Sequence, residues 1–564
     1  MRMLVRLSGS GYKAFESFSI DIKPLTILLG ANSCGKSAIL NAFLMLSQSV
    51  DAASLSESPL RLNGNRIGMG EPLNIMKDKN ENTLLNFNFE CNDVKGAKSL
   101  LDTARRECME AHFDISRYIF QVLRRNKDIE SSVFNSLMEM ESLYYRNDVY
   151  NFNQMKDING KTQRLIRRFR KFKETVKISN RSPMAQSNQR YIETVSLQKI
   201  EDCLTHLVPL SINRLVAQKI DYSFMYNQRK NTIWIKECKI SNKAGEMVLS
   251  IKSDGKNELN LYSDVINNEI IKRSKSDIKK VINLDSLLIT NSDPYKFYYN
   301  NFPGAIPNPV ATYINRILSA ALRDLNNSLS GSQVNHVSPL RAFPQRYYLL
   351  DKAIYHKQLN VLDGTELAEV LRNRPDIKTA INNLFMQFNI AIEVEKVNDI
   401  IHKITVNQDA VNLELTDVGF GISQVLPILV QALLSPSNSI TIIEQPEIHL
   451  HPKMQAWLTD ALIYIALEKN IKFIIETHSD ALVRRLRLRI VDESNPLTEN
   501  DVSIYYLERN RLKNRTDMKL IPVTPDGDIS WPSEFMDVEI NDTIEIQQKR
   551  IEKRLKRTEG DWNA

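Results

Sequence analysis

Apolar and polar positions alternate at the start of the chain and then give way to a continuous apolar run. Residues 4–7 and 18–22 alternate, which predicts two half-buried strands. Residues 25–29 are almost entirely apolar and end at Gly30, a pattern typical of a strand covered on both faces. Residues 37–47 then repeat their apolar positions at helical spacing. The start of the chain therefore predicts strands, a turn at Gly30 and a helix.

A long middle segment separates this start from a second α/β region. Residues 95–225 have helical composition with irregular apolar spacing, which predicts a helical insertion rather than a long coiled coil. Strand-like runs return at residues 232–238 and 247–251, and residues 338–535 mix strands and helices. We predict an α/β fold with a mostly helical insertion, divided into residues 1–95, 96–230, 231–335, 336–537 and a charged tail, 538–564.

Composition is that of a soluble globular protein. Of the 564 residues, 42% are hydrophobic and 25% charged, and no run of 18 apolar residues could span a membrane. The first residues lack the apolar core of a secretory signal. The five cysteines, an odd number without metal-ligand spacing, fit a reducing compartment. We expect a cytoplasmic protein with no membrane partner, and the net charge of +7 is mild for this length.

The turn at Gly30 carries a complete phosphate-binding motif. Residues 30–37 fit G-x-x-x-x-G-K-[ST], with the expected strand before them and helix after them. Glycines let successive N–H groups turn toward phosphate oxygens, and the helix N-terminus adds partial positive charge. Lys36 would reach the β- and γ-phosphates of ATP, and the Ser37 hydroxyl would ligate Mg²⁺. The predicted nucleotide-binding residues are Gly30, Ala31, Asn32, Ser33, Cys34, Gly35, Lys36, Ser37 and Ala38.

Residues far along the chain supply the rest of a nucleotide site. The apolar runs 439–443 and 471–475 predict buried strands, the first ending at Glu444 and the second followed by His478. Because strand ends in open α/β sheets gather at one edge, Lys36, Glu444 and His478 are expected to converge. The Glu444 carboxylate would hold the water shell of Mg²⁺.

A glycine- and serine-containing stretch precedes another predicted helix. Residues 415–424 read L-T-D-V-G-F-G-I-S-Q, and the start of the following helix is a second anion-binding surface. One nucleotide does not need two such surfaces from one chain, but a symmetric dimer does, because each subunit can cover the ATP held by the other. The predicted contacts across such a dimer are Gly419, Gly421, Ser423 and Gln424.

The order of these motifs resembles the ABC-type heads of the RecF, SMC and overcoming-lysogenization-defect ATPases. Residues 9–15 resemble the short turn that those heads place before the phosphate loop. Four segments are similar to a bacterial subfamily that includes PtuA, the ATPase of the Septu anti-phage system: residues 337–341 (V-S-P-L-R), 417–427, 443–452 (I-E-Q-P-E-I-H-L-H-P) and 527–535. The resemblance covers about residues 1–90 and 335–535, and the helical middle matches no named family.

This resemblance implies an ABC-ATPase head (P-loop NTPase) that uses ATP and Mg²⁺. It implies a homodimer or higher homo-oligomer that governs a separately encoded nuclease or other effector in phage defence. Only 86 residues follow His478 (564 − 478), so we expect no TOPRIM nuclease domain of the overcoming-lysogenization-defect kind. Two alternatives stay open: a RecF-like repair ATPase that binds DNA, and a non-catalytic ATP-sensing scaffold that holds a toxin or nuclease inactive.

The acidic strand departs from the usual ending of these heads. They end it Asp-Glu, the Asp for Mg²⁺ and the Glu to polarise the attacking water, whereas this chain has Glu444 and Gln445. A glutamine can orient a water but cannot act as a general base. Glu447 lies three residues after Glu444 and is the candidate to replace the missing general base. The predicted catalytic set is therefore Gln445, Glu447 and His478, with slow ATP turnover.

Several other residues fit more than one role. His449 and His451 are more typical of helix-start or dimer-contact residues than of a zinc pair, because the sequence offers no further ligands. Arg341 fits either a phosphate or dimer contact or a structural ion pair. The basic run from Lys161 to Lys173 fits a solvated helix face, packing on the core, a DNA- or RNA-binding surface, or a surface for a partner protein.

Overall fold

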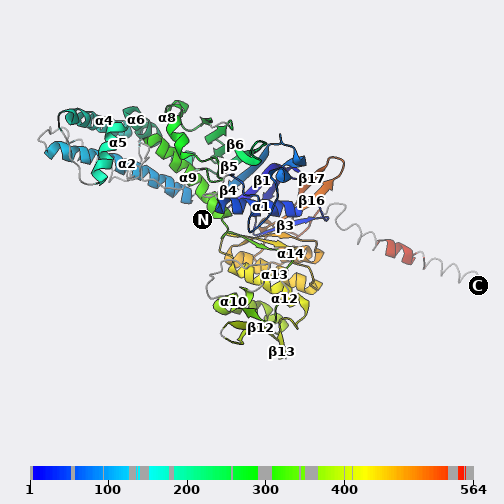
Figure 1. The fold of residues 1–564 in the computed structure, drawn as a ribbon. Coiled ribbons are helices and arrows are strands. Elements are labelled where there is room, and N and C mark those ends of the chain that lie inside the picture. Colours follow the sequence, from blue (N-terminus) through cyan, green and yellow to red (C-terminus); the bar gives the residue numbers. More distant parts are fainter. Residues whose placement is uncertain are drawn as a thin grey trace, which may run out of the picture. The chain divides into compact units, whose positions relative to one another are not determined.

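The computed structural model shows two compact units, Met1–Asp21 with Ala38–Val334 and Ile22–Ser37 with Asn335–Ala564 (Figure 1). Most of the predicted charged tail and residues 531–535 lie outside the described residues. The described residues are 4–52, 58–92, 95–125, 135, 138–139, 151–176, 183–255, 258–289, 308–341, 344–349, 366–398, 400–409, 411–530, 544–551 and 553.

The first unit contains an antiparallel sheet with the order β8-β7-β6-β5-β4-β1-β2. Strands lie where the alternation in residues 4–7, 18–22, 232–238 and 247–251 predicts them. The strands are β1 (Leu4–Tyr12), β2 (Phe15–Asp21), β4 (Leu85–Cys91), β5 (Lys219–Asn227), β6 (Thr232–Ser241), β7 (Met247–Ser253) and β8 (Leu259–Tyr262).

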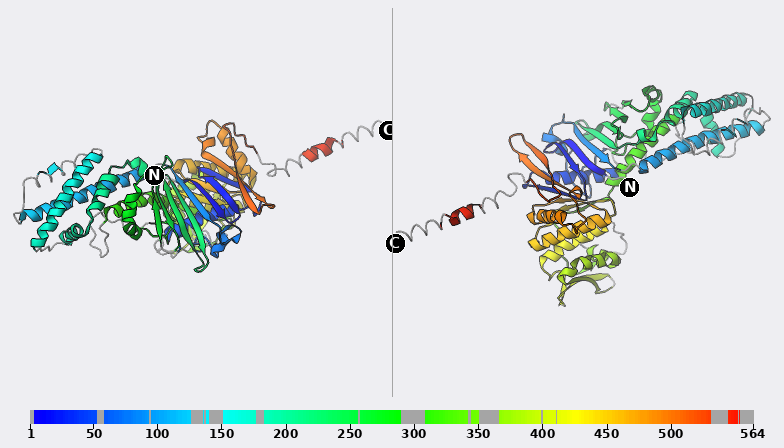
Figure 2. Two further views of the ribbon diagram at one scale, coloured as in Figure 1. Left: turned by 90° about the horizontal axis from the view of Figure 1, so that it is seen from above. Right: turned by 180° about the vertical axis from the view of Figure 1, so that it is seen from behind.

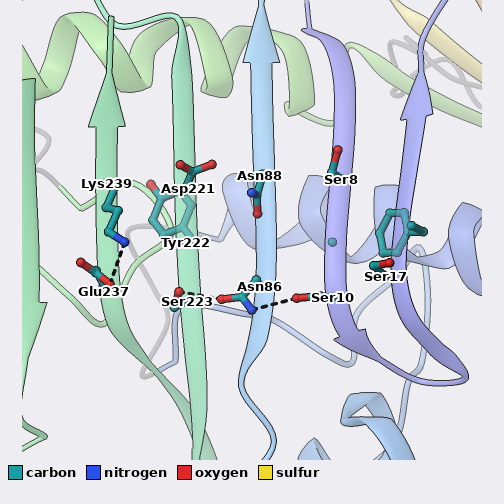
Figure 3. A pocket seen from close by; sticks show the side chains of 12 residues that line it. Ser8, Ser10, Ser17, Asn86, Asn88, Asp221, Tyr222, Ser223, Glu237 and Lys239 are labelled. Atoms are coloured by element: carbon teal, nitrogen blue, oxygen red, sulfur yellow. Dashed lines mark hydrogen bonds and ion pairs between the residues drawn. The ribbon is translucent and has the colours of Figure 1, made fainter. Parts of the chain in front are cut away.

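The two faces of this sheet differ in polarity. Phe87 and Phe89 of β4 are fully buried on one face. On the other face, hydroxyl and amide groups line a groove that crosses the strands (Figure 3). Ser223 Oγ donates to Asn86 Oδ1 at 2.6 Å, and Asn86 Nδ2 donates to Ser10 Oγ at 2.8 Å, so short polar side chains link β5, β4 and β1. This alternation follows from the two-residue period of a strand.

Helices make up most of the rest of the first unit. Helix α9 packs against α2 and α8, and α2 also packs against α4 (Figures 1 and 2). Strand β5 lies entirely within residues 96–230, the stretch predicted to be mostly helical, so the end of that stretch belongs to the sheet. The elements are η1 (Pro72–Ile75), η2 (Lys77–Lys79), α2 (Lys95–Arg125), α4 (Phe152–Thr175), α5 (Pro183–Thr194), α6 (Leu197–Glu201), the π-helical turn η3 (Asp202–Leu207), α7 (Ile212–Leu215), α8 (Asn268–Val281) and α9 (Pro309–Leu329).

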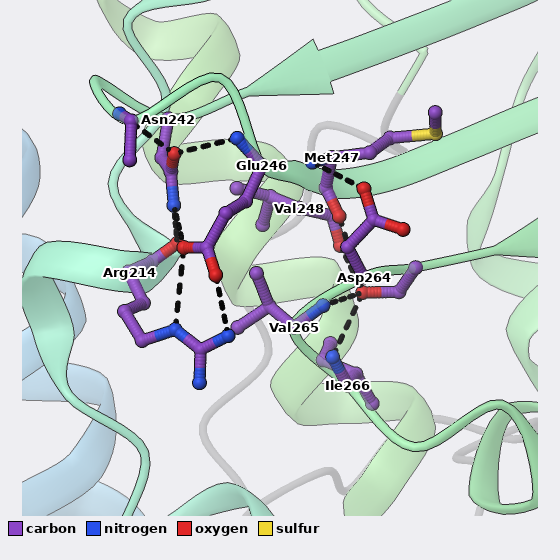
Figure 4. A network of polar contacts seen from close by, with 10 residues as sticks. Arg214, Asn242, Glu246, Met247, Val248, Asp264, Val265 and Ile266 are labelled. Atoms are coloured by element: carbon purple, nitrogen blue, oxygen red, sulfur yellow. Dashed lines mark hydrogen bonds and ion pairs between the residues drawn. The ribbon is translucent and has the colours of Figure 1, made fainter.

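A polar network joins α7 to the turn between β6 and β7 (Figure 4). The Glu246 carboxylate accepts hydrogen bonds from Arg214 Nη2 at 2.6 Å and from Asn242 Nδ2 at 2.8 Å. Asp264 accepts from the backbone N–H of Met247 at 2.9 Å. The contacts of Glu246 join this turn to α7, the helix that directly precedes β5.

The second unit is built on a mostly parallel sheet. Strand β3 (Leu25–Gly30) lies between β15 (Lys472–Glu476) and β16 (Val502–Asn510) and is parallel to both. Strand β14 (Ile440–Glu444) is parallel to β15, and β9 (Val334–Val337) lies beside β14. The hairpin partner β17 (Arg515–Ile521) is antiparallel to β16. All six residues of β3 are buried, as its apolar run predicts.

Helices and a small second sheet complete this unit. Helix α1 (Lys36–Asp51) begins directly after the β3 turn, and from Ala38 onward it belongs to the first unit. The other elements are β10 (Tyr348–Leu349), α10 (Glu366–Asn373), α11 (Pro375–Phe385), η4 (Met386–Phe388), β11 (Ile390–Lys396), β12 (Ile401–Gln408), β13 (Val411–Glu414), α12 (Phe420–Leu434), α13 (Pro452–Lys469), α14 (Asp480–Val491) and η5 (Glu499–Asp501). The predicted α/β fold class is confirmed. Among the described residues no helix has the length and apolarity needed to cross a membrane.

Candidate nucleotide-binding site

The turn after β3 has a backbone that requires glycine. Gly30 has φ +143°, and a Cβ there would lie 2.3 Å from the Leu507 carbonyl oxygen and 2.8 Å from Cys34 Sγ. Gly35 also has a positive φ of +107°, as does Ser33 at +62°. A side chain at Gly30 would force the loop away from β16. The two glycines of the motif are thus explained by backbone geometry.

The two reactive side chains of the motif lie beside a carboxylate. Lys36 is 3% exposed, and its Nζ donates to the carbonyls of Gly30 at 3.0 Å and Ala31 at 2.9 Å. The same Nζ lies 3.8 Å from Glu476 Oε1, and Ser37 Oγ donates to Glu476 Oε2 at 3.2 Å. A lysine curled into a loop of this shape, with a serine at the helix start, fits a phosphate group and its magnesium ion.

Two carboxylates end neighbouring strands at this edge. Glu444 and Glu476 are paired in register on β14 and β15. Burial raises the pKa of Glu476, opposed by the charge of Lys36 and reinforced by that of Glu444. The Nε2 of His336, on β9, lies 2.7 Å from Glu444 Oε1.

Sequence reasoning missed both Glu476 and His336. Glu476 could have been found, because it ends an apolar run just before the histidine at residue 478, which places it at the same sheet edge as Glu444. His336 gave no such signal, because β9 has only four residues.

Glu447 and His478 are joined through the turn after β15. Glu447 Oε2 accepts from Thr477 Oγ1 at 2.8 Å, and Oε1 accepts from the His478 backbone N–H at 2.7 Å. His478 is exposed on the surface, but partial desolvation of its ring lowers its pKa, and the positive charge of Lys36 lowers it further. Glu447 and His478 are therefore in contact, and the charge of Lys36 acts on His478. Both Glu447 oxygens are already used to hold the turn.

Backbone contacts hold the turn that follows β14. Gln445, in this turn, has a left-handed backbone with φ +43°, and its N–H donates to the Glu476 carbonyl at 2.7 Å. Arg341, which is 5% exposed, holds the same turn: its Nη2 donates to the carbonyls of Glu444 at 3.2 Å and Gln445 at 3.0 Å. Burial lowers the pKa of Arg341 to about 10, while Glu447 opposes the shift. Arg341 thus contacts the backbone of the acidic turn.

The glycine–serine stretch begins α12, as predicted, but its residues differ in exposure. Gly419 precedes the helix and is exposed, and Gly421 is partly exposed. Ser423 and Gln424 are each only 3% exposed, so both lie on the core side of the helix. The accessible part of the predicted signature is therefore its two glycines.

The two histidines after the acidic strand are not gathered in a metal site. His451 is the N-cap of α13, and its Nδ1 accepts from the backbone N–H of Lys453 at 3.2 Å, which makes it a helix-start residue. His449 is exposed. No group of three or more metal-ligating side chains with suitable geometry exists among the described residues.

The basic run of α4, in the first unit, is partly structural. Phe169 is fully buried, and Arg170 donates to the carbonyls of Ile192 and Val195 at 2.6–2.8 Å. Lys161 and Lys173 form ion pairs with Glu139 and Glu193 respectively. Three cations of the run are exposed at helical spacing: Arg164, Arg167 and Lys171.

The fold and the loop define an ATPase of the P-loop class. The family model described as "AAA ATPase domain" matches residues 3–483, and the chain belongs to this family. The family's members are ATP-binding ATPases.

Solved SMC heads are among the structures similar to this chain. The SMC head domain from Thermotoga maritima is 8% identical, with 93% of this chain and 99% of that chain covered and a TM-score of 0.30. An Smc head bound to the C-winged helix domain of ScpA is 10% identical, with 92% and 98% covered and a TM-score of 0.33.

Proposed function

We propose that this chain is an ABC-type ATPase that binds ATP and Mg²⁺ at residues 30–37 and hydrolyses ATP slowly. The observation that carries this proposal is the position of Lys36 and Ser37 beside Glu476, whose strand neighbour ends in Glu444. Bound magnesium would neutralise phosphate charge. Ser37 and Glu444 would hold that ion, directly or through water, and Lys36 would contact the phosphates.

Slow turnover is supported by the two candidates for a general base. Gln445 carries an amide, which cannot accept a proton from water at neutral pH. Glu447 could do so, but both of its oxygens accept hydrogen bonds from the turn at Thr477 and His478. This engagement also favours a second candidate function, an ATP-holding scaffold that turns over almost no nucleotide.

We further propose that two heads associate around nucleotide, with the exposed start of α12 covering the ATP of the other head. Gly419 and Gly421 are accessible for such a contact. The associated heads and the separated heads would expose different surfaces. A separately encoded nuclease or other effector in the bacterial cytoplasm would respond to that difference. The role in phage defence rests on the sequence similarity to the Septu ATPase subfamily.

Nucleotide binding by the purified chain tests the core of this function. Lys36→Ala should abolish binding of ATP with Mg²⁺, whereas Lys513→Ala, which removes an exposed lysine on the β16–β17 turn, should not. Turnover is measured in the same samples, with and without DNA. Steady hydrolysis that DNA accelerates would favour the RecF-like alternative, and loss of phage protection with Lys36→Ala would support defence. Equal ATP binding by all three proteins would refute the assignment of the loop.

A further inference from the structure

Glu476 contacts both side chains that the phosphate loop offers to a ligand. It is 5% exposed at the end of β15. One carboxylate oxygen accepts the Ser37 hydroxyl at 3.2 Å, and the other lies 3.8 Å from Lys36 Nζ. The Glu476 carboxylate thus contacts the same two side chains, Lys36 and Ser37, that we expect to bind the phosphates and the magnesium ion.

Two further carboxylates surround this position. Glu444 is the register partner of Glu476, and the charge of Glu447 also acts on it. Compensating cations are Lys36 and the buried Arg341, which donates to backbone carbonyls rather than to a carboxylate. A phosphate that approaches Lys36 would therefore meet net negative charge beside two buried side chains, Lys36 and Glu476, where charges interact more strongly than in water.

We propose that Glu476 makes nucleotide binding at this loop dependent on a divalent cation. The inference rests on the proposed function, because it concerns the same loop. Without the cation, the phosphates are repelled by Glu476 and must compete with it for Lys36 and Ser37. With Mg²⁺, the carboxylate faces a cation instead, so it favours the metal-bound nucleotide over the free one.

The affinity for ATP, measured by titration calorimetry in Mg²⁺ and again in EDTA, tests this role. For the unmodified chain we expect a dissociation constant at least about tenfold higher in EDTA than in Mg²⁺. Glu476→Gln keeps the shape and removes the charge, so the ratio should shrink by about tenfold, mainly through tighter binding in EDTA. Glu476→Asp keeps the charge and should keep most of the dependence. Glu468→Gln, at an exposed site on α13, is the matched control and should leave the ratio unchanged.

Each outcome bears on a definite claim. A ratio near one in the unmodified chain overturns the role of Glu476, whether or not the variants fold. An equal loss of affinity in both conditions with Glu476→Gln also overturns it, since that result marks a structural residue only. If the unmodified chain binds no ATP even in Mg²⁺, the proposed function itself fails, and the inference fails with it.

Discussion

His336 Nε2 lies 2.7 Å from Glu444 Oε1, so a histidine on the four-residue strand β9 orients the carboxylate that we assign to magnesium. Partners of this kind fix the direction of a ligand, and their removal typically costs 10- to 100-fold in metal affinity. We expect His336→Ala to raise the Mg²⁺ concentration needed for half-maximal ATP binding by about tenfold. His206→Ala, an exposed histidine in the first unit, is the control. An unchanged requirement for Mg²⁺ would mean that Glu444 needs no partner.

Gly30 should tolerate no side chain. In Gly30→Ala the new Cβ would meet the Leu507 carbonyl oxygen at 2.3 Å, and φ +143° is itself strained for alanine. We expect the free energy of unfolding to fall by about 2–4 kcal/mol, measured by urea denaturation. Gly160→Ala is a sharp control, because no atom lies within 4 Å of the added Cβ and the residue is inside helix α4. That change should stabilise by up to about 1 kcal/mol. Equal stability of the two variants would contradict the geometry of the loop.

The exposure of α12 decides how head association should be tested. Ser423 is buried, so Ser423→Arg would force a charge into the core and destabilise the fold. Gly419 is exposed and a Cβ added there meets no atom of another residue within 4 Å, so Gly419→Arg should leave folding and ATP binding intact. We expect it to block ATP-dependent association, measured by sedimentation in Mg²⁺ and ATP. Association that persists in Gly419→Arg would show that the start of α12 does not meet the other head.

The sequence predicts the phosphate loop well because its signal is local. An apolar run, two glycines, a lysine and a serine follow one another within 13 residues, 25–37, and each has a direct structural reason. The apolar runs that become β14 and β15 are equally local. The contact of Ser37 with Glu476 spans 439 positions, and periodicity carries no information on which strands become neighbours. Sequence reasoning therefore found the sheet edge but not all of its members.

Exposure within α12 could not be predicted for a different reason. The helix is apolar on nearly every side, so its pattern does not indicate which face is covered. The sequence therefore predicts Ser423 as a contact residue, whereas the structure buries it. The left-handed backbone of Gln445 also lacked a signal, because glycine is the usual marker of positive φ.

The basic run of α4 should divide into structural and exposed residues. Arg170 donates three hydrogen bonds to the carbonyls of Ile192 and Val195, and a buried acceptor left without its partner is costly. We expect Arg170→Ala to lower stability by about 1–3 kcal/mol. Arg164→Ala, on the exposed side of the same helix, should change it by less than about 0.5 kcal/mol. Thermal unfolding of the two variants compares them directly. Similar melting temperatures would mean that Arg170 stabilises the fold no more than Arg164 does.

Acid should destabilise the second unit through His402. This residue of β12 is 1% exposed, and neither ring nitrogen has a hydrogen-bond partner among the described residues. Burial lowers its pKa, and the positive charges of Arg372 and Lys396 lower it further. The folded chain therefore keeps this ring neutral at a pH where the unfolded chain, with an ordinary histidine pKa of about 6.5, takes up a proton.

The unfolded state binds the extra proton, so the contribution of His402 to the free energy of unfolding is complete above the ordinary histidine pKa. This contribution is lost as the pH falls below that value toward the pKa of the folded state. The loss approaches about 1.4 kcal/mol per pH unit for one group. We expect His402→Phe, which places an apolar ring there, to flatten the fall in unfolding free energy between about pH 7 and pH 5.5. Urea denaturation across this range measures the slope. His206→Phe, at an exposed position, should keep the slope of the unmodified chain. If His402→Phe also kept the slope of the unmodified chain, the loss of stability in acid would have to come from other groups.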